Sequence, residues 1–248
     1  MVLDFDKNKL TIGVLGGMGS YATLHLFKRL LDAFPAEKEW GRPRIIIDNR
    51  CTMPSRVRAV IYNERREELV NAMSDSVSRL LDYGCDKIIL DCNTSHIFLN
   101  EVLSRSSCPP GVVFDMIEIL AENMSRAGIK EAGLLATEGT FSSRVFDKYF
   151  SPKSIRLINP STDKFKTIRL FIESVKTQAV DRKIRSHFVD FLKKMNCRDI
   201  ILGCTELPVI YEQAKNEVND AKIKIWDPLE QVILRIKEFA GRNAGACV

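Results

Sequence analysis

The chain has 248 residues, of which 45% are hydrophobic and 28% charged, and its formal net charge is +5 at pH 7. This composition is that of an ordinary globular protein able to bury sizeable cores, and a disordered chain is not expected. The basic residues form no run interleaved with aromatic residues and no apolar run approaches the length of a membrane span, so neither a nucleic-acid partner nor a membrane is expected.

The cysteine and histidine pattern bears on compartment and metal binding. Seven cysteines are an odd number without CxxC spacing, and the three histidines form no ligand pairs with them, so neither a disulfide framework nor a metal site is predicted. The start of the chain also lacks the basic and apolar segments of an export signal. We therefore expect a cytoplasmic protein with reduced thiols.

The first part of the chain reads as alternating strands and helices. An apolar strand over residues 10–15 breaks at Gly16-Gly17-Met18-Gly19 into a helix over 21–34. The turn matches neither a dinucleotide fingerprint nor a phosphate loop, and it suits a close approach of a ligand carboxylate to backbone donors. Next we expect a strand over 44–48, a loop over 49–56, a helix over 67–83, a strand ending at Cys92, and a helix over 93–103 capped by Asn93 or Thr94.

The second part repeats this alternation after a break at residues 108–111. The expected elements are helices over 114–127, 140–150, 165–178 and 181–195, and strands over 131–136, 155–158 and 223–226, with a further strand ending at Cys204. Asp227 is predicted to cap a final helix whose first residue is Pro228.

Two pairs of similar segments indicate an internal repeat. Residues 85–94 and 197–206 both end a β-branched run in a cysteine, with a spacing of 204 − 92 = 112 residues, and residues 12–19 and 132–139 match with a spacing of 133 − 13 = 120. We therefore predict an α/β fold of two pseudo-symmetric domains with mainly parallel sheets and the active site in the cleft between them. The expected division is an N-terminal domain over 1–111, a C-terminal domain over 112–222, and a last strand and helix over 223–248.

Cys92 and Cys204 are the candidate reactive residues, because each ends a predicted strand and is followed at once by polar residues. Cys85 and Cys197 precede their strands and are expected in the core. Two thiols facing one cleft suit removal of a proton from a carbon acid by one thiolate and delivery of a proton by the other thiol, which inverts the carbon. Helix dipoles and neighbouring donors would have to stabilise the thiolate.

The motifs together resemble the aspartate/glutamate racemase family, closest to the aspartate racemases. They occur in the family's order over residues 10 to 240: Gly16-Gly17-Met18-Gly19 with Ala22-Thr23, Cys92-Asn93-Thr94-Ser95-His96, Leu135-Ala136-Thr137-Glu138-Gly139-Thr140, Gly203-Cys204-Thr205-Glu206, and Asp227-Pro228. The resemblance implies racemisation of an acidic amino acid, aspartate first, without pyridoxal phosphate or any other cofactor. It also implies a homodimer, and it implies that the last strand and helix over 223–248 return to the N-terminal domain.

The resemblance further implies a role for particular residues. Cys92 and Cys204 match the two catalytic cysteines, and Arg56 and Lys176 match the residues that recognise the side-chain carboxylate. The α-carboxylate and amino group would be held by Asn93, Thr94, Thr137, Thr140 and Thr205, and Gly17, Met18 and Glu206 complete the expected substrate-binding set.

Three serines, Ser20, Ser55 and Ser95, depart from the family pattern. Ser55 stands where an acidic residue commonly precedes the arginine, which leaves open the choice between aspartate, glutamate and a broader specificity. A decarboxylase or isomerase of the same superfamily is a further alternative, although such decarboxylases need only one of the cysteines. A cytoplasmic small-molecule-binding module without catalysis is another.

Overall fold

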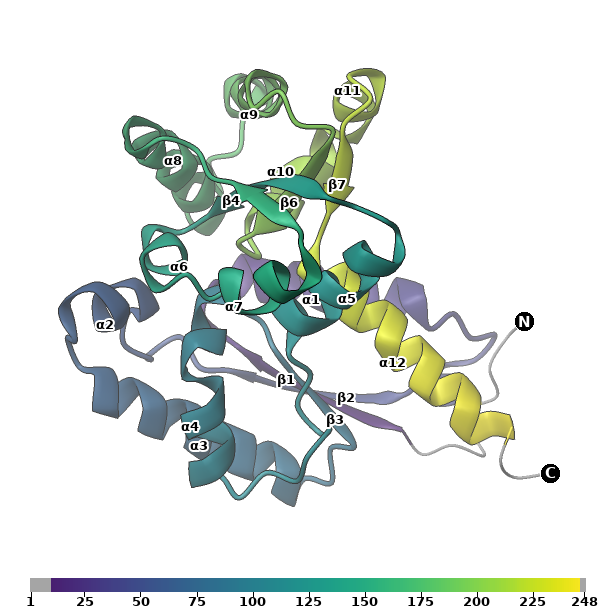
Figure 1. The fold of residues 1–248 in the computed structure, drawn as a ribbon. Helices are drawn as coiled ribbons and strands as arrows, with labels where there is room; N and C mark the ends of the chain where they lie inside the picture. The colour runs from purple at the N-terminus through teal and green to yellow at the C-terminus, as the bar shows by residue number, and fades with distance from the viewer. Residues whose placement is uncertain (1–9, 246–248) are drawn as a thin grey trace.

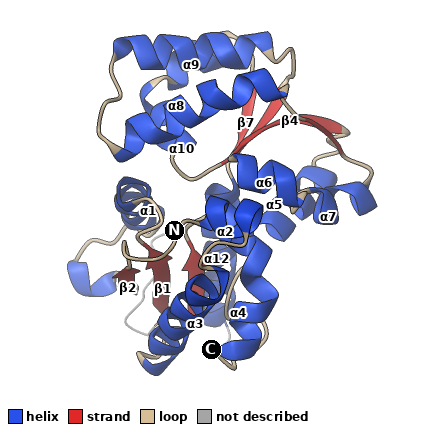
Figure 2. Ribbon diagram, turned by 90° about the vertical axis from the view of Figure 1, so that its left-hand side faces the viewer, coloured by secondary structure: helices blue, strands red, loops and turns tan. Residues whose placement is uncertain are grey.

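The computed structural model describes residues 10–245, which form two parallel β-sheets with helices on their faces (Figures 1 and 2). The first sheet has the order β2-β1-β3 and the second the order β5-β4-β6-β7, and all paired strands are parallel. In each sheet the first strand of the half lies between the second and the third, β1 between β2 and β3 and β4 between β5 and β6, which confirms the predicted fold of two similar α/β halves. The strands are β1 (Thr11–Gly16), β2 (Arg44–Asn49), β3 (Lys87–Leu90), β4 (Glu131–Ala136), β5 (Arg156–Ile158), β6 (Asp199–Gly203) and β7 (Lys224–Trp226).

The central strands are apolar along their length because both of their faces are covered. Ile12, Val14 and Leu15 of β1 are fully buried, as expected for a parallel strand between two helical layers. The helices are α1 (Ser20–Ala33), α2 (Arg56–Tyr62), α3 (Arg66–Asp82), α4 (Leu99–Arg105), α5 (Met116–Arg126), α6 (Glu138–Ser143), α7 (Asp147–Phe150), α8 (Phe165–Lys176), α9 (Arg182–Lys194), α10 (Leu207–Gln213), α11 (Lys215–Asp220) and α12 (Pro228–Gly245). Short 3-10 helices lie at Glu39–Gly41, Asn93–Phe98, Ser151–Lys153 and Thr162–Lys164.

The repeat extends further than the cysteine motifs. Residues 112–114 run beside β3, where Ile88 N–H donates to Val112 O at 2.9 Å, just as β7 runs beside β6 in the second sheet. Each of these edge segments is followed by an aspartate that caps a helix, Asp115 before α5 and Asp227 before α12, and 227 − 115 = 112 equals the cysteine spacing. Each half thus ends with the same strand, aspartate and helix.

These two terminal helices pack against each other between the sheets (Figure 1). One buried apolar cluster joins β1 and α1 of the first half, β4 of the second half, and both α5 and α12. Two further clusters lie on the outer sides of the sheets, where α3 and α4 cover the first and α8, α9 and α10 cover the second. The two halves therefore share a continuous core.

Several local predictions need correction. The last strand was expected to return to the N-terminal domain with the final helix, but β7 pairs with β6 in the second sheet. Residues 112–114, expected in the C-terminal domain, pair with the first sheet. The domain limits themselves stay a prediction.

The sequence analysis also missed helices α2, α10 and α11. The expected loop over 49–56 ends at Ser55, and α2 begins directly after it. The Ser55 hydroxyl accepts the Arg58 N–H at 3.3 Å and so caps this helix. The segment after Cys92 begins as a 3-10 helix with Cys92 itself at the N-cap, and neither Asn93 nor Thr94 caps it.

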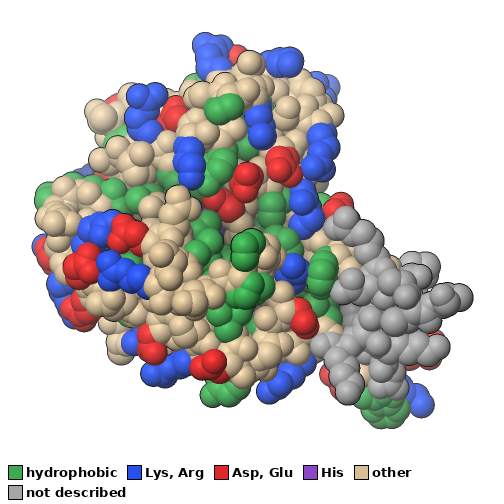
Figure 3. All heavy atoms as spheres, turned by 60° about the horizontal axis from the view of Figure 1, so that its bottom comes forward, with side chains coloured by type: hydrophobic (Ala, Val, Ile, Leu, Met, Phe, Trp, Pro, Cys, Tyr) green, Lys and Arg blue, Asp and Glu red, His purple; other side chains and the backbone are tan. Residues whose placement is uncertain are grey.

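Acidic and basic side chains are interspersed over the face drawn in Figure 3. Among residues 10–245, no helix is both long enough and apolar enough to cross a membrane.

The Asp115 cap allows a stability test of the shared core. Its carboxylate accepts the N–H groups of Ile117 and Glu118 and the Tyr149 hydroxyl, so Asp115→Ala leaves these donors without their acceptor. We expect Asp115→Ala to lower the free energy of unfolding by about 1–2 kcal/mol in urea titrations. Asp115→Asn retains a capping oxygen and should lose much less, and equal losses in the two variants would contradict this account.

Candidate active site

The two cysteines singled out by the sequence lie at equivalent strand ends. Cys92 follows β3 and Cys204 follows β6, and these are corresponding strands of the two sheets. Cys204 is buried and Cys92 is partly exposed. Burial, together with the neighbouring Glu206 and Cys92, raises the pKa of the Cys204 thiol well above its usual range. The two thiols are thus close enough to interact electrostatically although they come from opposite halves.

The backbone of Cys92 is held firmly. Its carbonyl accepts hydrogen bonds from the Ser95 hydroxyl at 2.6 Å, the Ser95 N–H at 3.2 Å and His96 Nδ1 at 3.0 Å. His96 Nε2 in turn accepts the Met116 N–H at 3.3 Å, which assigns the proton to Nδ1 and ties Cys92 to the start of α5. The sequence analysis missed this role of His96, and its position four residues after Cys92 was the available signal.

Glu206 contacts the other thiol directly. The Cys204 Sγ–H donates to Glu206 Oε2 at 2.9 Å, and the carboxyl group is 3% exposed. A Cβ atom at Gly19 would lie 2.2 Å from Glu206 Oε1, so the glycine turn after β1 makes room for this carboxyl group. The Cys204 thiol is thus a hydrogen-bond donor to a carboxyl oxygen, and its burial and the neighbouring Glu206 oppose its ionisation.

A second buried carboxyl group lies directly before Cys92. Asp91 is 1% exposed, and neither of its oxygens has a hydrogen-bond partner among the described residues. Burial and the nearby carboxyl groups of Glu206 and Asp227 raise the pKa of Asp91 well above its usual range, against the opposing effects of Thr23 and Arg29. Burial at this position thus favours the uncharged form of the Asp91 carboxyl group.

Three threonine hydroxyls meet where the halves touch. Thr94 Oγ1 lies 3.0 Å from Thr137 Oγ1 and 3.0 Å from Thr140 Oγ1, and the latter two are 3.1 Å apart. Thr137 also caps α6 by accepting the Thr140 N–H. Each hydroxyl can redirect its proton toward an anion, so the cluster is a ready donor set for a carboxylate.

Asn93 and Thr205 lie beside the cysteines that precede them. The Asn93 amide is 2% exposed, and both its oxygen and its nitrogen lack a partner within the described chain. Buried amide groups without partners are rare, so a bound molecule is the natural candidate to satisfy them. The Thr205 hydroxyl donates to Asp91 O at 3.5 Å and so links the two strand ends.

The glycine turn after β1 and the nearby Arg56 have fewer free hydrogen-bond donors for a ligand than expected. The Gly17 N–H donates to Thr23 Oγ1 at 3.2 Å, so it is not free for a ligand, and Gly17 has a φ of +78° that favours glycine. Arg56 donates to Met18 O at 2.7 Å and to Pro54 O at 3.2 Å. A guanidinium has five N–H donors, so Arg56 retains some for a ligand.

Lys176 ends α8 beside the Cys204 thiol. Partial burial opposes its charge, but Glu206, Glu173 and Cys204 raise the pKa of its ammonium group, which stays positive. Lys176 donates to Glu173 at 3.0 Å. Both Lys176 and Thr137 line a cavity of about 310 Å³ between α2, α6 and α8, in the space between the two halves.

The structure thus brings Cys92, Cys204, Glu206, Lys176 and the threonine cluster to the facing ends of two parallel sheets. Within the described residues, no group of His, Cys, Asp and Glu side chains could hold a metal ion. Such a fold and site define an α/β protein with one thiol from each of two repeated halves. The chain belongs to the Asp/Glu/hydantoin racemase family, whose model matches residues 15–233.

Individual relatives agree with this assignment. The chain is 26% identical to the glutamate racemase of Carboxydothermus hydrogenoformans, over 97% of this chain and 86% of that protein. It is 24% identical to the broad-specificity amino-acid racemase RacX of Bacillus subtilis, over 84% of this chain and 90% of the relative. Among solved structures, Picrophilus torridus aspartate racemase superposes with a TM-score of 0.79 at 26% identity, covering 94% of each chain.

The uncharged state of Asp91 can be tested through stability. The unfolded chain releases this proton near pH 4 while the folded chain retains it, so unfolding becomes more favourable as pH rises toward the folded pKa. The free energy of unfolding should fall by about 1.4 kcal/mol per pH unit in this window relative to Asp91→Asn, which cannot ionise. Urea titrations from pH 4 to pH 8 measure this difference.

The exposed Asp190→Asn serves as the control, and it should follow the parent protein at each pH. A parent and an Asp91→Asn variant with parallel pH profiles would show that Asp91 is ionised in the folded state.

Proposed function

We propose that this protein is a racemase that inverts the α-carbon of an acidic amino acid, aspartate first, by two-base catalysis with Cys92 and Cys204 and without a cofactor. The main support is the placement of one thiol at the end of each corresponding strand, near enough for their charges to interact. Membership of the racemase family supports the same class of reaction.

In the proposed reaction one cysteine, as thiolate, takes the α-proton, and the other, as thiol, donates a proton to the opposite face of the planar carbanion. The charge of the substrate carboxylate, which grows as the proton leaves, would be met by the Thr94, Thr137 and Thr140 hydroxyls and the unpartnered Asn93 amide. Glu206 would take the Cys204 proton when that thiolate forms, because it already accepts the thiol hydrogen bond.

The side-chain carboxylate would pair with Lys176, and with the N–H groups of Arg56 that the backbone does not use. Lys176 lines the cavity that opens from Thr137 of the threonine cluster. Glutamate is the second candidate substrate, because several of the relatives are glutamate racemases. The homodimer implied by the family resemblance stays part of the proposal, and light scattering of the purified protein would test it.

The substrate charge gives the first test of this proposal. Aspartate should be racemised and alanine should not, and Lys176→Met should lower kcat/KM for aspartate by at least about 30-fold, the effect of losing a partner for a partly buried charge. The measurement is chiral chromatography after incubation with each L-amino acid.

Lys166→Met is the matched control, because Lys166 is an exposed lysine of α8 that does not line the cavity. Comparable turnover of alanine and aspartate by the parent protein would contradict the proposed specificity.

The two thiols give the second test. Each inversion needs one base and one acid, so Cys92→Ala and Cys204→Ala should each slow racemisation by at least about 10²–10⁴-fold, and the double variant should lose little more. In deuterated water each single variant should exchange the α-hydrogen of a different enantiomer without inverting it. Chiral chromatography with mass spectrometry measures both quantities.

The partly exposed Cys108 lies between α4 and residues 112–114, which run beside Ile88 near the start of β3, and Cys108→Ala should behave like the parent protein. Racemisation at near the parent rate in either active-site variant would refute the two-thiol mechanism. Release of carbon dioxide without inversion would indicate a decarboxylase, and binding of aspartate without any turnover would indicate a binding module.

A further inference from the structure

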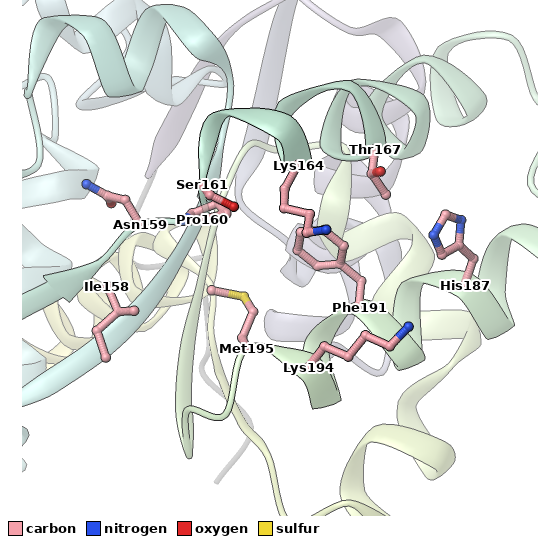
Figure 4. Close-up of a pocket in the computed structure, with 10 residues that line it drawn as sticks. All are labelled: Ile158, Asn159, Pro160, Ser161, Lys164, Thr167, His187, Phe191, Lys194 and Met195. Carbon is pink, nitrogen blue, oxygen red and sulfur yellow. The ribbon is translucent and has the colours of Figure 1, made fainter.

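A second cavity lies in the C-terminal half, away from both cysteines. It has a volume of about 310 Å³ and lies between the segment after β5, the start of α8, and α9 (Figure 4). Both this cavity and the cleft cavity are lined by α8, but they have no lining residue in common. A ligand bound here would therefore be distinct from the proposed amino-acid substrate.

The base of this cavity is apolar and well fixed. Phe191 is 8% exposed, and its ring packs edge-on against Phe171 of α8, with ring centroids 5.7 Å apart. The thioether of Met195 lies on the neighbouring part of the wall (Figure 4). An aromatic ring and a thioether side by side offer favourable contacts to another aromatic ring.

The cavity is lined by two cationic side chains. Lys164 extends from the start of α8 toward Phe191, and Lys194 lies on the other side of that ring (Figure 4). None of the described lining residues is acidic. Lys164 contacts Asp163 at 3.0 Å, but their side chains are 54% and 65% exposed, and such a pair contributes little. Lys194 forms no ion pair with any residue between 10 and 245.

The cleft cavity differs in this respect. Its lining also includes two acidic residues, Glu138 and Glu173, which contact Arg169 and Lys176. The cavity beside α9 instead combines an apolar base with two lysines that lack strong partners. Ligand sites are commonly apolar cavities with a few placed polar groups that orient the ligand.

We propose that this cavity is a second ligand site and that it binds a small aromatic carboxylate. The ring of the ligand packs on Phe191 and Met195, and its carboxylate pairs with Lys164 and Lys194. The proposal does not depend on the racemase reaction, because its contacts are made outside the cleft.

The probe for this site is 3-phenylpropionate, titrated into the full-length protein and followed by isothermal titration calorimetry. Binding should be saturable at millimolar concentration. It should be at least about tenfold weaker for the uncharged 3-phenylpropan-1-ol, and absent for the cationic 3-phenylpropylamine and for propionate, which has no ring. Failure of 3-phenylpropionate to bind, or equal binding of the alcohol, would overturn the proposal.

The lysines are tested with a pair of variants of equal net charge. Lys164→Ala/Lys194→Ala should weaken binding of 3-phenylpropionate at least about tenfold. Lys166→Ala/Lys193→Ala removes two exposed lysines, each within two residues of a tested one, that do not line the cavity, and it should bind like the parent protein. Equal affinity in the two double variants would overturn the proposed carboxylate contacts, and thermal melting confirms that both are folded.

A last comparison separates this site from the cleft. The probe should bind with unchanged affinity in the presence of saturating aspartate and in the Cys92→Ala/Cys204→Ala variant. Displacement of the probe by aspartate would place it in the cleft and would refute a second site, without bearing on whether the protein is a racemase.

Discussion

The packing of α5 against α12 sets the geometry of the whole molecule. Each of these helices follows a segment at the edge of one sheet, residues 112–114 or β7, and each starts at a capping aspartate, Asp115 or Asp227. Their shared apolar cluster holds the two sheets together, and it includes residues from the central strand of each. Because parallel strands all end at the same edge, this packing brings the ends of β3 and β6 to face each other. A pair of opposed thiols then needs only one cysteine at each of these ends.

The electrostatics of the site follow from the burial of its ionisable side chains. Cys204, Glu206 and Asp91 are all buried, and the cations near them already have carboxylate partners: Arg29 pairs with Asp227 and Glu230, and Lys176 pairs with Glu173. Burial therefore favours the protonated forms of Asp91 and of the Cys204 thiol. The surroundings of the two cysteines therefore differ, although the two halves of the backbone have similar strand orders. Cys92 has its carbonyl fixed by three donors, whereas Cys204 has its sulfur bonded to a carboxyl oxygen.

Much of this fold could be predicted from the sequence, because buried parallel strands are continuous apolar runs and their repeat is visible in residues 85–94 and 197–206. The candidate site could be predicted for residues that follow such strands directly, Cys92 and Cys204 above all. It could not be predicted for contacts that depend on tertiary approach. The fit of Glu206 against Gly19, and the link from His96 to Met116, join segments far apart in the chain. The helices α2, α10 and α11 were missed because each has only six or seven residues, too few to show a helical period.

The position of α12 has a consequence for the order in which the protein forms during synthesis. Leu26 and Leu30 of α1 lie in the same buried cluster as Val232 and Ile236 of α12, which are about 200 positions later in the chain. The first half emerges from the ribosome first, yet it cannot complete its core until nearly the whole chain has been translated. The second sheet, whose outer cluster is built from residues 135 to 223, can close on itself earlier. Until α12 arrives, the apolar faces of α1 and α5 are exposed, and this interval is when the nascent chain is most open to chaperone binding and to aggregation.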